Sequence, residues 1–341
     1  MSNKLQSKDF NDILVEKGLN ETKRILSQSL KQIEEDQEVK NKPNLIVKTI
    51  KEFLSEELPQ KEYIIDKIFP KQGLMMIYAK RGIGKTFFAL YLSCKIASGS
   101  SLFDNRWKVS KARKILYIDG EMPAITMQER LANIVANFSE DDLSNNLSIL
   151  TNDLQKNHRL LPDIASIEGQ EELKPLIQDH DIIVIDNLST LCRSGKENES
   201  NSWITIQDWV LGLRSQGKSV IFVHHAGKNN DQRGTSKKED ILDTVINLKR
   251  PDDYDSKEGA RFEVHFEKSR GFAGDDAKPF ELNMNFDSGK ADFEVKEIED
   301  LQLKRVVELS QMKMTQREIA QEMNISASTV NRLLKKATEL L

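Results

Sequence analysis

The chain has 341 residues, long enough for one core of about two hundred residues together with smaller appendages. Charged residues make up 30% of the sequence and the formal net charge is -4, which argues against a surface coated in phosphate-binding groups but leaves room for a local basic patch. No apolar run reaches the roughly eighteen residues of a membrane span, and the first residues lack the apolar core of a secretion signal, so we expect a cytoplasmic protein with no membrane partner.

The first segment, residues 1–45, is polar and rich in lysine and glutamate. Its apolar residues recur at helical intervals, which predicts one or two exposed helices followed by a linker. A partly disordered tail is the alternative interpretation. The apolar positions that carry the helical prediction are Phe10, Ile13, Leu14, Ile25, Leu30 and Ile33.

Residues 46–298 follow a different pattern, in which short apolar runs alternate with longer amphipathic stretches. Continuous apolar strands separated by helices are typical of a parallel sheet that is covered on both faces. Towards the end of this region the period changes to two, which predicts antiparallel strands at one edge. We therefore expect an α/β domain with a mostly parallel central sheet. The expected strands are 74–78, 115–118, 182–185, 220–223, 261–267, 280–286 and 293–298.

A glycine-containing loop joins the first of these strands to a helical pattern. Glycines at 82 and 84 let consecutive backbone amides point at one anion, Lys85 can reach the terminal phosphates of a nucleotide, and the Thr86 hydroxyl can ligate magnesium. The usual first glycine of such a loop is Ala79, a small substitution that we expect to be tolerated. The predicted ATP-binding residues are Ala79, Lys80, Arg81, Gly82, Ile83, Gly84, Lys85, Thr86 and Phe87.

Two later strands end in carboxylates. Asp186 follows four β-branched residues, and a carboxylate at the carboxyl end of a buried strand beside the loop would hold magnesium together with Thr86. Glu121 lies just past the strand 115–118, from which it could orient the attacking water for hydrolysis. Asp119 competes for this role, and by spacing alone either carboxylate could be a turn or capping residue.

Two further groups of polar residues end strands. The strand 220–223 is followed by His224 and His225, and we favour His224 as a sensor of the γ-phosphate; in the alternative, one histidine caps the strand and the other packs. Lys268 and Arg270 share one face of the strand that begins at Arg261. They could stabilise phosphoryl-transfer charge on an adjacent subunit, or form a solvated strand end.

Several short motifs occur in an order that resembles the RecA-like ATPases related to the hexameric replicative helicase RepA of broad-host-range plasmids. The resemblance covers roughly residues 53–298. The motifs are the loop 79–86, Gly120-Glu121-Met122-Pro123, Ile185-Asp186-Asn187, Val223-His224-His225-Ala226-Gly227-Lys228, Arg233-Gly234-Thr235-Ser236 and Lys268-x-Arg270.

This resemblance implies roles for individual residues. Glu121 would be the catalytic base, His224 would couple nucleotide state to DNA contact, and Lys268 with Arg270 would act on a neighbour's ATP, so that a ring, expected to be hexameric, or a filament is needed for full activity. The loop 233–238 would contact DNA, which suits its small residues and cations. Its predicted DNA-binding residues are Arg233, Thr235, Ser236 and Lys237, although Glu239 and Asp240 weaken the local positive charge.

The final segment, residues 299–341, looks like a helix-turn-helix. Thr315 and Glu318 form a capping box at a helix start, Asn324 suits the turn, and Ser326 or Ser328 opens a second helix. Residues 301–341 hold seven Lys or Arg against four acidic residues, which favours a phosphate partner, although such units also serve as protein-docking modules. The predicted DNA-facing residues are Ser328, Thr329, Asn331 and Arg332.

Together these features predict a RecA-like ATPase that uses ATP and Mg²⁺ and acts on single-stranded or duplex DNA. We expect a DNA-associated motor, in its most specific form a RepA-like replicative helicase of a plasmid or mobile element. The alternative is an ATP-dependent recombination or regulatory protein that assembles on DNA without unwinding it.

Overall fold

The computed structural model of the chain describes residues 18–28, 45–136, 138, 143, 145–194, 200–227, 239–251, 253–287 and 289–339. It divides into two compact units, Met1–Gln60 and Lys61–Leu341. In the first unit, residues 18–28 are helical, and a short helix α2 (Ile50–Leu54) begins at a capping box formed by Thr49 and Glu52. Of the positions that predicted the N-terminal helices, only Ile25 lies within the described residues. No described helix is long and apolar enough to cross a membrane.

The strands of the second unit alternate with helices and then follow one another directly. The strands are β1 (Tyr63–Ile65), β2 (Phe69–Pro70), β3 (Leu74–Ala79), β4 (Ile115–Asp119), β5 (Leu147–Thr151), β6 (Ile182–Asp186), β7 (Ser219–His225), β8 (Thr244–Lys249), β9 (Arg261–Ser269), β10 (Phe280–Asp287) and β11 (Lys290–Glu297). The helices are α3 (Lys85–Ser98), α4 (Ala124–Val135), α6 (Ile167–Gln178), α7 (Leu188–Leu191), α8 (Ser200–Ser215), α9 (Ile298–Gln311), α10 (Gln316–Glu322) and α11 (Ala327–Glu339).

Among the described residues, nine strands form one sheet in the order β11-β10-β9-β8-β3-β7-β6-β4-β5. The six strands from β8 to β5 run parallel, and β9, β10 and β11 are added antiparallel at one edge. Strands β1 and β2 pair with each other in a separate hairpin. This arrangement confirms the predicted α/β architecture with a mostly parallel sheet and antiparallel edge strands.

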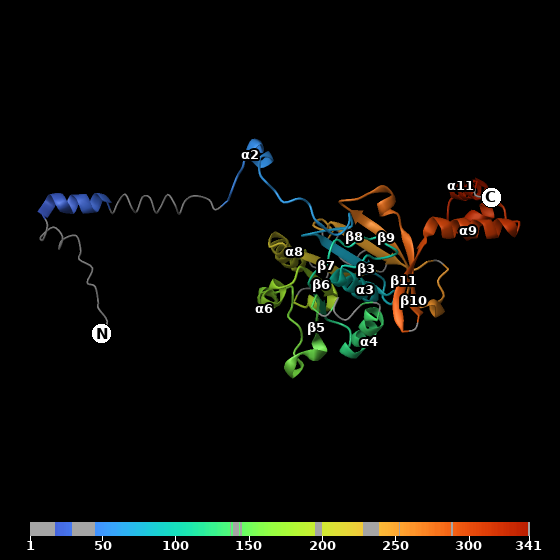
Figure 1. Cartoon of the computed structure of the whole chain (residues 1–341), viewed down its shortest axis with the longest axis horizontal. Coiled ribbons are helices and arrows are strands. Elements are labelled where there is room, and N and C mark those ends of the chain that lie inside the picture. The colour runs from blue at the N-terminus through green and yellow to red at the C-terminus, as the bar shows by residue number, and fades with distance from the viewer. Residues whose placement is uncertain are drawn as a thin grey trace. The chain divides into compact units, whose positions relative to one another are not determined.

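Helices cover both faces of the sheet (Figure 1). Apolar residues of α3 and α4 pack on one face, and those of α6, α7 and α8 pack on the other. The strands β3, β4, β6 and β7 are buried along their whole length, as continuous apolar runs predict. Because all six parallel strands end at the same edge, the loops that follow β3, β4, β6 and β7 gather there.

The sheet continues directly into three C-terminal helices, since β11 ends at Glu297 and α9 begins at Ile298. Helices α9, α10 and α11 enclose a small core of their own, in which Val306, Ile319, Val330 and Leu333 are fully buried. The predicted capping box of Thr315 and Glu318 is present at the start of α10. These helices have the arrangement expected of a helix-turn-helix.

Two strands of the sheet were not predicted. β5 is the edge strand beside β4 and is only partly buried, so its sequence lacks a continuous apolar signal. β8 lies between β3 and β9 and pairs with both. Its sequence has polar residues at both ends and one in its interior, so no continuous apolar run predicted this nearly fully buried strand. The sequence is Thr244-Val245-Ile246-Asn247-Leu248-Lys249.

Candidate functional site

The glycine loop follows β3 and opens α3 at the edge where the parallel strands end. Gly84 is the N-cap of α3 with φ 118°, and Gly82 has φ 77°, which is a backbone conformation that only glycine adopts without strain. Phe88 N donates to Gly84 O at 2.9 Å and so begins the helix. The free amides at this helix start form the kind of concave surface that binds phosphate.

Ala79, which replaces the usual first glycine, is a strand residue. It is the last residue of β3, it is fully buried, and its carbonyl accepts a hydrogen bond from Ala226 N at 2.8 Å. Ala79 is not among the residues with positive φ, so its Cβ causes no backbone strain. The strand conformation explains why alanine is compatible with this loop.

Lys85 is 7% exposed and its Nζ donates to Lys80 O at 3.2 Å. Burial lowers the pKa of Lys85, while the carboxylates of Asp186 and Glu121 raise it. The ammonium group is therefore poorly solvated and lies close to negative charge. A group in this state can exchange its protein contacts for phosphate oxygens.

Asp186 ends β6 and is 2% exposed. It accepts hydrogen bonds from Tyr117 Oη at 2.7 Å and from the side chain of Thr86, yet burial still raises its pKa. A desolvated carboxylate beside a threonine hydroxyl is the hard-oxygen pair that magnesium prefers. The structure thus brings the two predicted magnesium ligands together, while the identity of the metal remains a prediction.

Asp119 and Glu121 differ sharply in their surroundings. Asp119 is 1% exposed and accepts hydrogen bonds from Glu121 N at 3.0 Å and Met122 N at 2.6 Å. Burial and the neighbouring Asp186 raise the pKa of Asp119 to about 7. Glu121 has a side chain that is 56% exposed. Asp119 therefore holds the turn after β4, and Glu121 is the carboxylate that water can reach.

The two histidines lie on opposite faces of the sheet because strand residues alternate. His225 shares the α3 face with Asp186, and its Nε2 lies 3.5 Å from Glu121 Oε2. Burial and nearby Lys85 lower the pKa of His225, which keeps the ring neutral at pH 7. His224 is fully buried beside Tyr78 on the opposite face. The structure thus places His225, and not the favoured His224, beside Glu121; a sensor role for either remains a prediction.

Comparison with known families agrees with this geometry. The family model described as AAA domain matches residues 40–231, more than half of the chain. The chain belongs to the AAA domain family. The model described as Sigma-70, region 4, matches residues 302–341, which include most of α9 and all of α10 and α11. No curated protein matches this sequence.

Among solved structures, a KaiC-like protein of the hyperthermophilic archaeon Pyrococcus horikoshii is similar to this AAA domain protein. The two chains are 14% identical, the match covers 67% of this chain and 93% of the other, and the TM-score is 0.47. The membership in the AAA domain family supports P-loop ATPase chemistry at the loop 79–86.

Lys268 and Arg270 lie at the opposite end of the sheet from the P-loop of the same chain. In the register of the sheet, Ser269 is beside Thr244, and Thr244 is beside Met75 near the start of β3. The P-loop follows the other end of β3, roughly 13 Å or more away at strand spacing. The two cations therefore do not reach the phosphate site of their own chain.

Both cations hold the backbone that precedes β8. Lys268 Nζ donates to Glu239 O and, at 3.2 Å, to Asp240 O, and Arg270 donates to Asp240 O at 3.0 Å. Burial and the neighbouring Arg270 lower the pKa of Lys268. The action of this pair on a neighbouring subunit remains a prediction.

Arg250 contacts the P-loop and was not predicted from the sequence. Its guanidinium donates to Gly82 O at 3.1 Å and lies 4.5 Å from the centroid of the Tyr254 ring. Arg250 directly follows β8, so its place at the P-loop depends on the pairing of β8 with β3. No local pattern in the sequence predicts that pairing.

The predicted DNA contacts fall in two regions. Arg233, Thr235, Ser236 and Lys237 lie outside the described residues. In the helix-turn-helix, Ser326 caps α11, because Thr329 N donates to Ser326 Oγ at 3.1 Å and the Thr329 hydroxyl lies 2.8 Å from the same oxygen. Ser328, Asn331 and Arg332 are exposed on α11, and Thr329 is partly buried.

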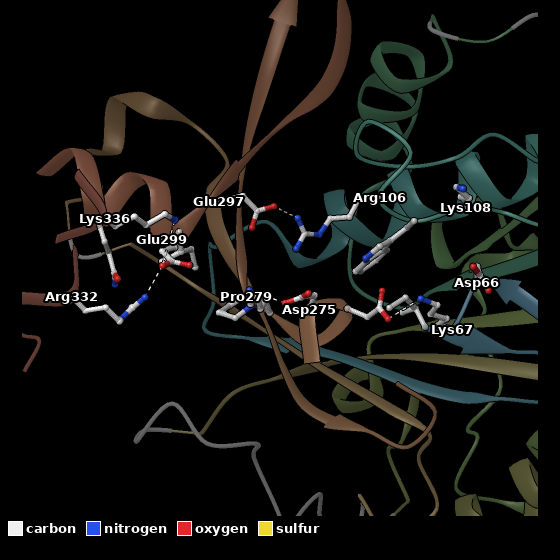
Figure 2. Close-up of a pocket in the computed structure, with 16 residues that line it drawn as sticks. Asp66, Lys67, Arg106, Lys108, Asp275, Pro279, Glu297, Glu299, Arg332 and Lys336 are labelled. Carbon is white, nitrogen blue, oxygen red and sulfur yellow. Dashed lines mark hydrogen bonds and ion pairs between the residues drawn. The ribbon is translucent and has the colours of Figure 1, made fainter. Parts of the chain in front are cut away.

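Arg332 is engaged in an ion pair within the helical unit. Its guanidinium donates to Glu299 at 2.6 Å, and Lys336 lies 3.5 Å from the same carboxylate. These groups line a cavity of about 830 Å³ beside the junction of β11 and α9, where Arg106 also pairs with Glu297 (Figure 2). None of the residues that line this cavity belongs to the P-loop.

Proposed function

We propose that this AAA domain protein hydrolyses ATP to ADP and phosphate at the loop 79–86. The observation that carries the proposal is the convergence of Lys85, Asp186 and Glu121 from three separate segments at one sheet edge. Asp186 accepts a hydrogen bond from Thr86, which directly follows Lys85. Asn187, which directly follows Asp186, donates to the Glu121 carboxylate. A cation, a buried carboxylate and a solvent-accessible carboxylate are the groups that phosphoryl transfer to water needs.

Each group would act in a distinct way. Lys85 and the amides of the loop 79–86 bind the phosphates, and Thr86 with Asp186 places Mg²⁺. Bound Mg²⁺ would neutralise the charge that develops on the phosphate oxygens. Glu121 accepts a proton from the attacking water, since it is the acidic group of the site that solvent reaches. The neutral ring of His225 lies close enough to Glu121 to respond to a change at the γ-phosphate.

The active assembly we propose is a homo-oligomer, either a hexameric ring or a filament. Lys268 and Arg270 lie too far from their own P-loop to contact its phosphates. Acting on the ATP of a neighbouring subunit would give these two cations a role in catalysis, as an arginine finger has. Measurement of the native mass with and without ATP tests this part of the proposal.

We further propose that ATP hydrolysis drives movement on DNA, in its most specific form unwinding by a RepA-like replicative helicase of a plasmid or mobile element. The direct continuation of β11 into α9 supports this, because the ATPase sheet and the DNA-binding helices share one continuous backbone. The order of motifs from residue 79 to Arg270 supports it as well.

The decisive experiment combines two assays on the full chain. The ATPase rate is measured with and without single-stranded DNA, and strand displacement is measured on a forked duplex. We expect single-stranded DNA to raise the ATPase rate, and we expect Lys85→Ala to abolish strand displacement. If DNA does not change the ATPase rate and Lys85→Ala still displaces strands, the helicase proposal is wrong.

A second candidate is an ATP-dependent regulatory or recombination protein that assembles on DNA without unwinding it. The match of the sigma-70 region 4 model to residues 302–341 favours it, because a helix-turn-helix reads base edges in the major groove of a duplex. This candidate predicts sequence-specific duplex binding that is lost on deletion of residues 300–341, together with no displacement of a strand.

A further inference from the structure

Asn187 directly follows the buried carboxylate Asp186, and its side chain is engaged at both ends. The residue is 2% exposed. Its Oδ1 accepts hydrogen bonds from Ser189 N at 2.9 Å and Thr190 N at 3.3 Å, so Asn187 is the N-cap of α7. Its Nδ2 donates to the carboxylate of Glu121 and lies 3.3 Å from His225 Nε2.

The helix cap fixes which way the amide group faces. Because Oδ1 accepts from two backbone N–H groups, the NH₂ group must face away from α7. The reversed orientation would place Oδ1 against the Glu121 carboxylate and Nδ2 against the backbone donors of α7. The NH₂ group therefore faces Glu121 and His225, and it can donate to the Glu121 carboxylate.

The Glu121 carboxylate is held through one oxygen. Among the described residues, the contacts of Glu121 with Asn187 and His225 both involve Oε2. The side chain is otherwise 56% exposed, and an exposed glutamate samples several rotamers. Fixing Oε2 leaves Oε1 available to accept a proton from water in a defined position.

We propose that Asn187 is a positioning residue that orients Glu121 for activation of the attacking water. The inference rests on the proposed role of Glu121 as the base. It adds that the orientation of Glu121 is set by the cap of α7, so that a displacement of α7 displaces the carboxylate as well. The competing explanation is that Asn187 only caps α7 and that its contact with Glu121 has no effect on the reaction.

Asn187→Ser separates the two explanations. Serine retains an oxygen that caps a helix, but it is too short to reach Glu121. We expect kcat to fall about 10- to 100-fold, since mispositioning of a reacting group has effects of this size. We expect the Kd for a fluorescent ATP analogue and the midpoint of thermal unfolding to be unchanged. Hydrogen exchange of the amides of residues 188–191, measured without nucleotide, should also be unchanged.

Asn187→Ala is the matched comparison, because it removes the cap as well. We expect the same fall in kcat, together with faster hydrogen exchange of residues 188–191 in the protein without nucleotide. If Asn187→Ser retains the kcat of the wild type while Asn187→Ala loses it, capping alone explains Asn187 and the proposal is wrong.

Asn187→Asp tests whether position 187 is in contact with the group whose titration controls the reaction. Aspartate can still accept from the α7 amides, but it places a second carboxylate against Glu121. A neighbouring like charge raises the pKa of a carboxyl group. We therefore expect the acidic limb of the pH profile of kcat to move to higher pH, and an unmoved limb would contradict the proposal.

A double-mutant cycle with Glu121→Gln distinguishes failure of this inference from failure of the proposed base. If Asn187 acts through Glu121, Asn187→Ser has no further effect on kcat in the Glu121→Gln background. An equal loss in both backgrounds would overturn the positioning role. If Glu121→Gln by itself retains the kcat of the wild type, the proposed role of Glu121 as the base is wrong.

Discussion

The phosphate site and the exposed face of the helix-turn-helix use polar side chains in opposite ways. In the phosphate site, Lys85, Asp186 and Asn187 are each at most 7% exposed, and each is held by protein partners. On α11, Ser328, Asn331 and Arg332 are exposed, and Arg332 forms a surface ion pair with Glu299.

This difference determines how each region responds to change. Buried polar groups interact in a low-dielectric surrounding, so that loss of one partner leaves another group unsatisfied and has a large effect. Exposed ion pairs contribute little to stability and are screened by salt. We therefore expect substitutions in the phosphate site to have large effects on the reaction, and substitutions on α11 to have small, salt-dependent effects on DNA affinity.

The largest expected effect follows Lys85→Ala. Removal of the ammonium group should lower kcat/KM for ATP by on the order of 10²- to 10³-fold, the loss typical of a group that stabilises transition-state charge. Lys80→Ala is the matched control, because Lys80 is exposed in the same loop and contacts Lys85 only through its backbone carbonyl. Duplex binding should be unchanged in both variants; a weaker affinity in Lys85→Ala alone would show that the two regions are coupled.

The next largest effect is on kcat, and it shows which of the two carboxylates after β4, Asp119 or Glu121, is the base. Glu121→Gln should lower kcat by about 10²-fold, at the low end of the loss that removal of a general base causes. Asp119→Asn should lower it much less, because asparagine can still accept the bonds from Glu121 N and Met122 N that hold the turn. Steady-state ATPase assays at pH 7 measure both. A larger loss for Asp119→Asn would identify Asp119 as the base.

Asp119 should also make stability depend on pH. Burial and Asp186 raise its pKa to about 7, so between about pH 4 and 7 the folded state binds more protons than the unfolded state. The free energy of unfolding that Asp119 contributes is therefore present at low pH and is lost as the pH rises through 7. Relative to Asp119→Asn, the wild type should lose roughly a few kcal/mol over this range. Urea unfolding without nucleotide and with EDTA tests this, and parallel pH curves for the two proteins would contradict it.

A smaller effect concerns the capping box of α10. Thr315→Ala removes the oxygen that accepts from Glu318 N and should destabilise α10 by about 1 kcal/mol. Hydrogen exchange of the α10 amides should then be roughly fivefold faster, while the P-loop amides are unchanged. Gln321→Ala, at an exposed position of the same helix, is the control and should leave exchange unchanged.

The smallest expected effect concerns Glu299. The ion pair with Arg332 and Lys336 holds the pKa of Glu299 below its usual range and competes with DNA phosphates for both cations. Glu299→Gln should raise duplex affinity up to about fivefold at low salt, the range of an exposed ion pair. The slope of log K against log salt should steepen by about one to two. Glu308→Gln, which affects only a pair with Arg305 inside α9, is the control. An unchanged slope would place Arg332 away from the bound DNA.

The sequence by itself determined the local parts of this protein. The glycine loop, the apolar strands that end at Ala79 and Asp186, and the capping box at Thr315 are each encoded within a few consecutive residues. The period of apolar residues also predicted the antiparallel strands at the sheet edge. These features depend on backbone conformation and on the burial of residues close together in the chain. Both leave a pattern in a short stretch of sequence, so both can be predicted from it.

Only the tertiary structure decided which distant residues meet. The insertion of β8 beside β3 brings Arg250 to the P-loop and places Lys268 and Arg270 at the far end of the sheet. Alternation along β7 predicts that His224 and His225 face opposite ways, but the position of α3 decides which of them meets Glu121. Strand order and helix packing fix these contacts through many weak, distant interactions, and no short segment of the sequence carries that information.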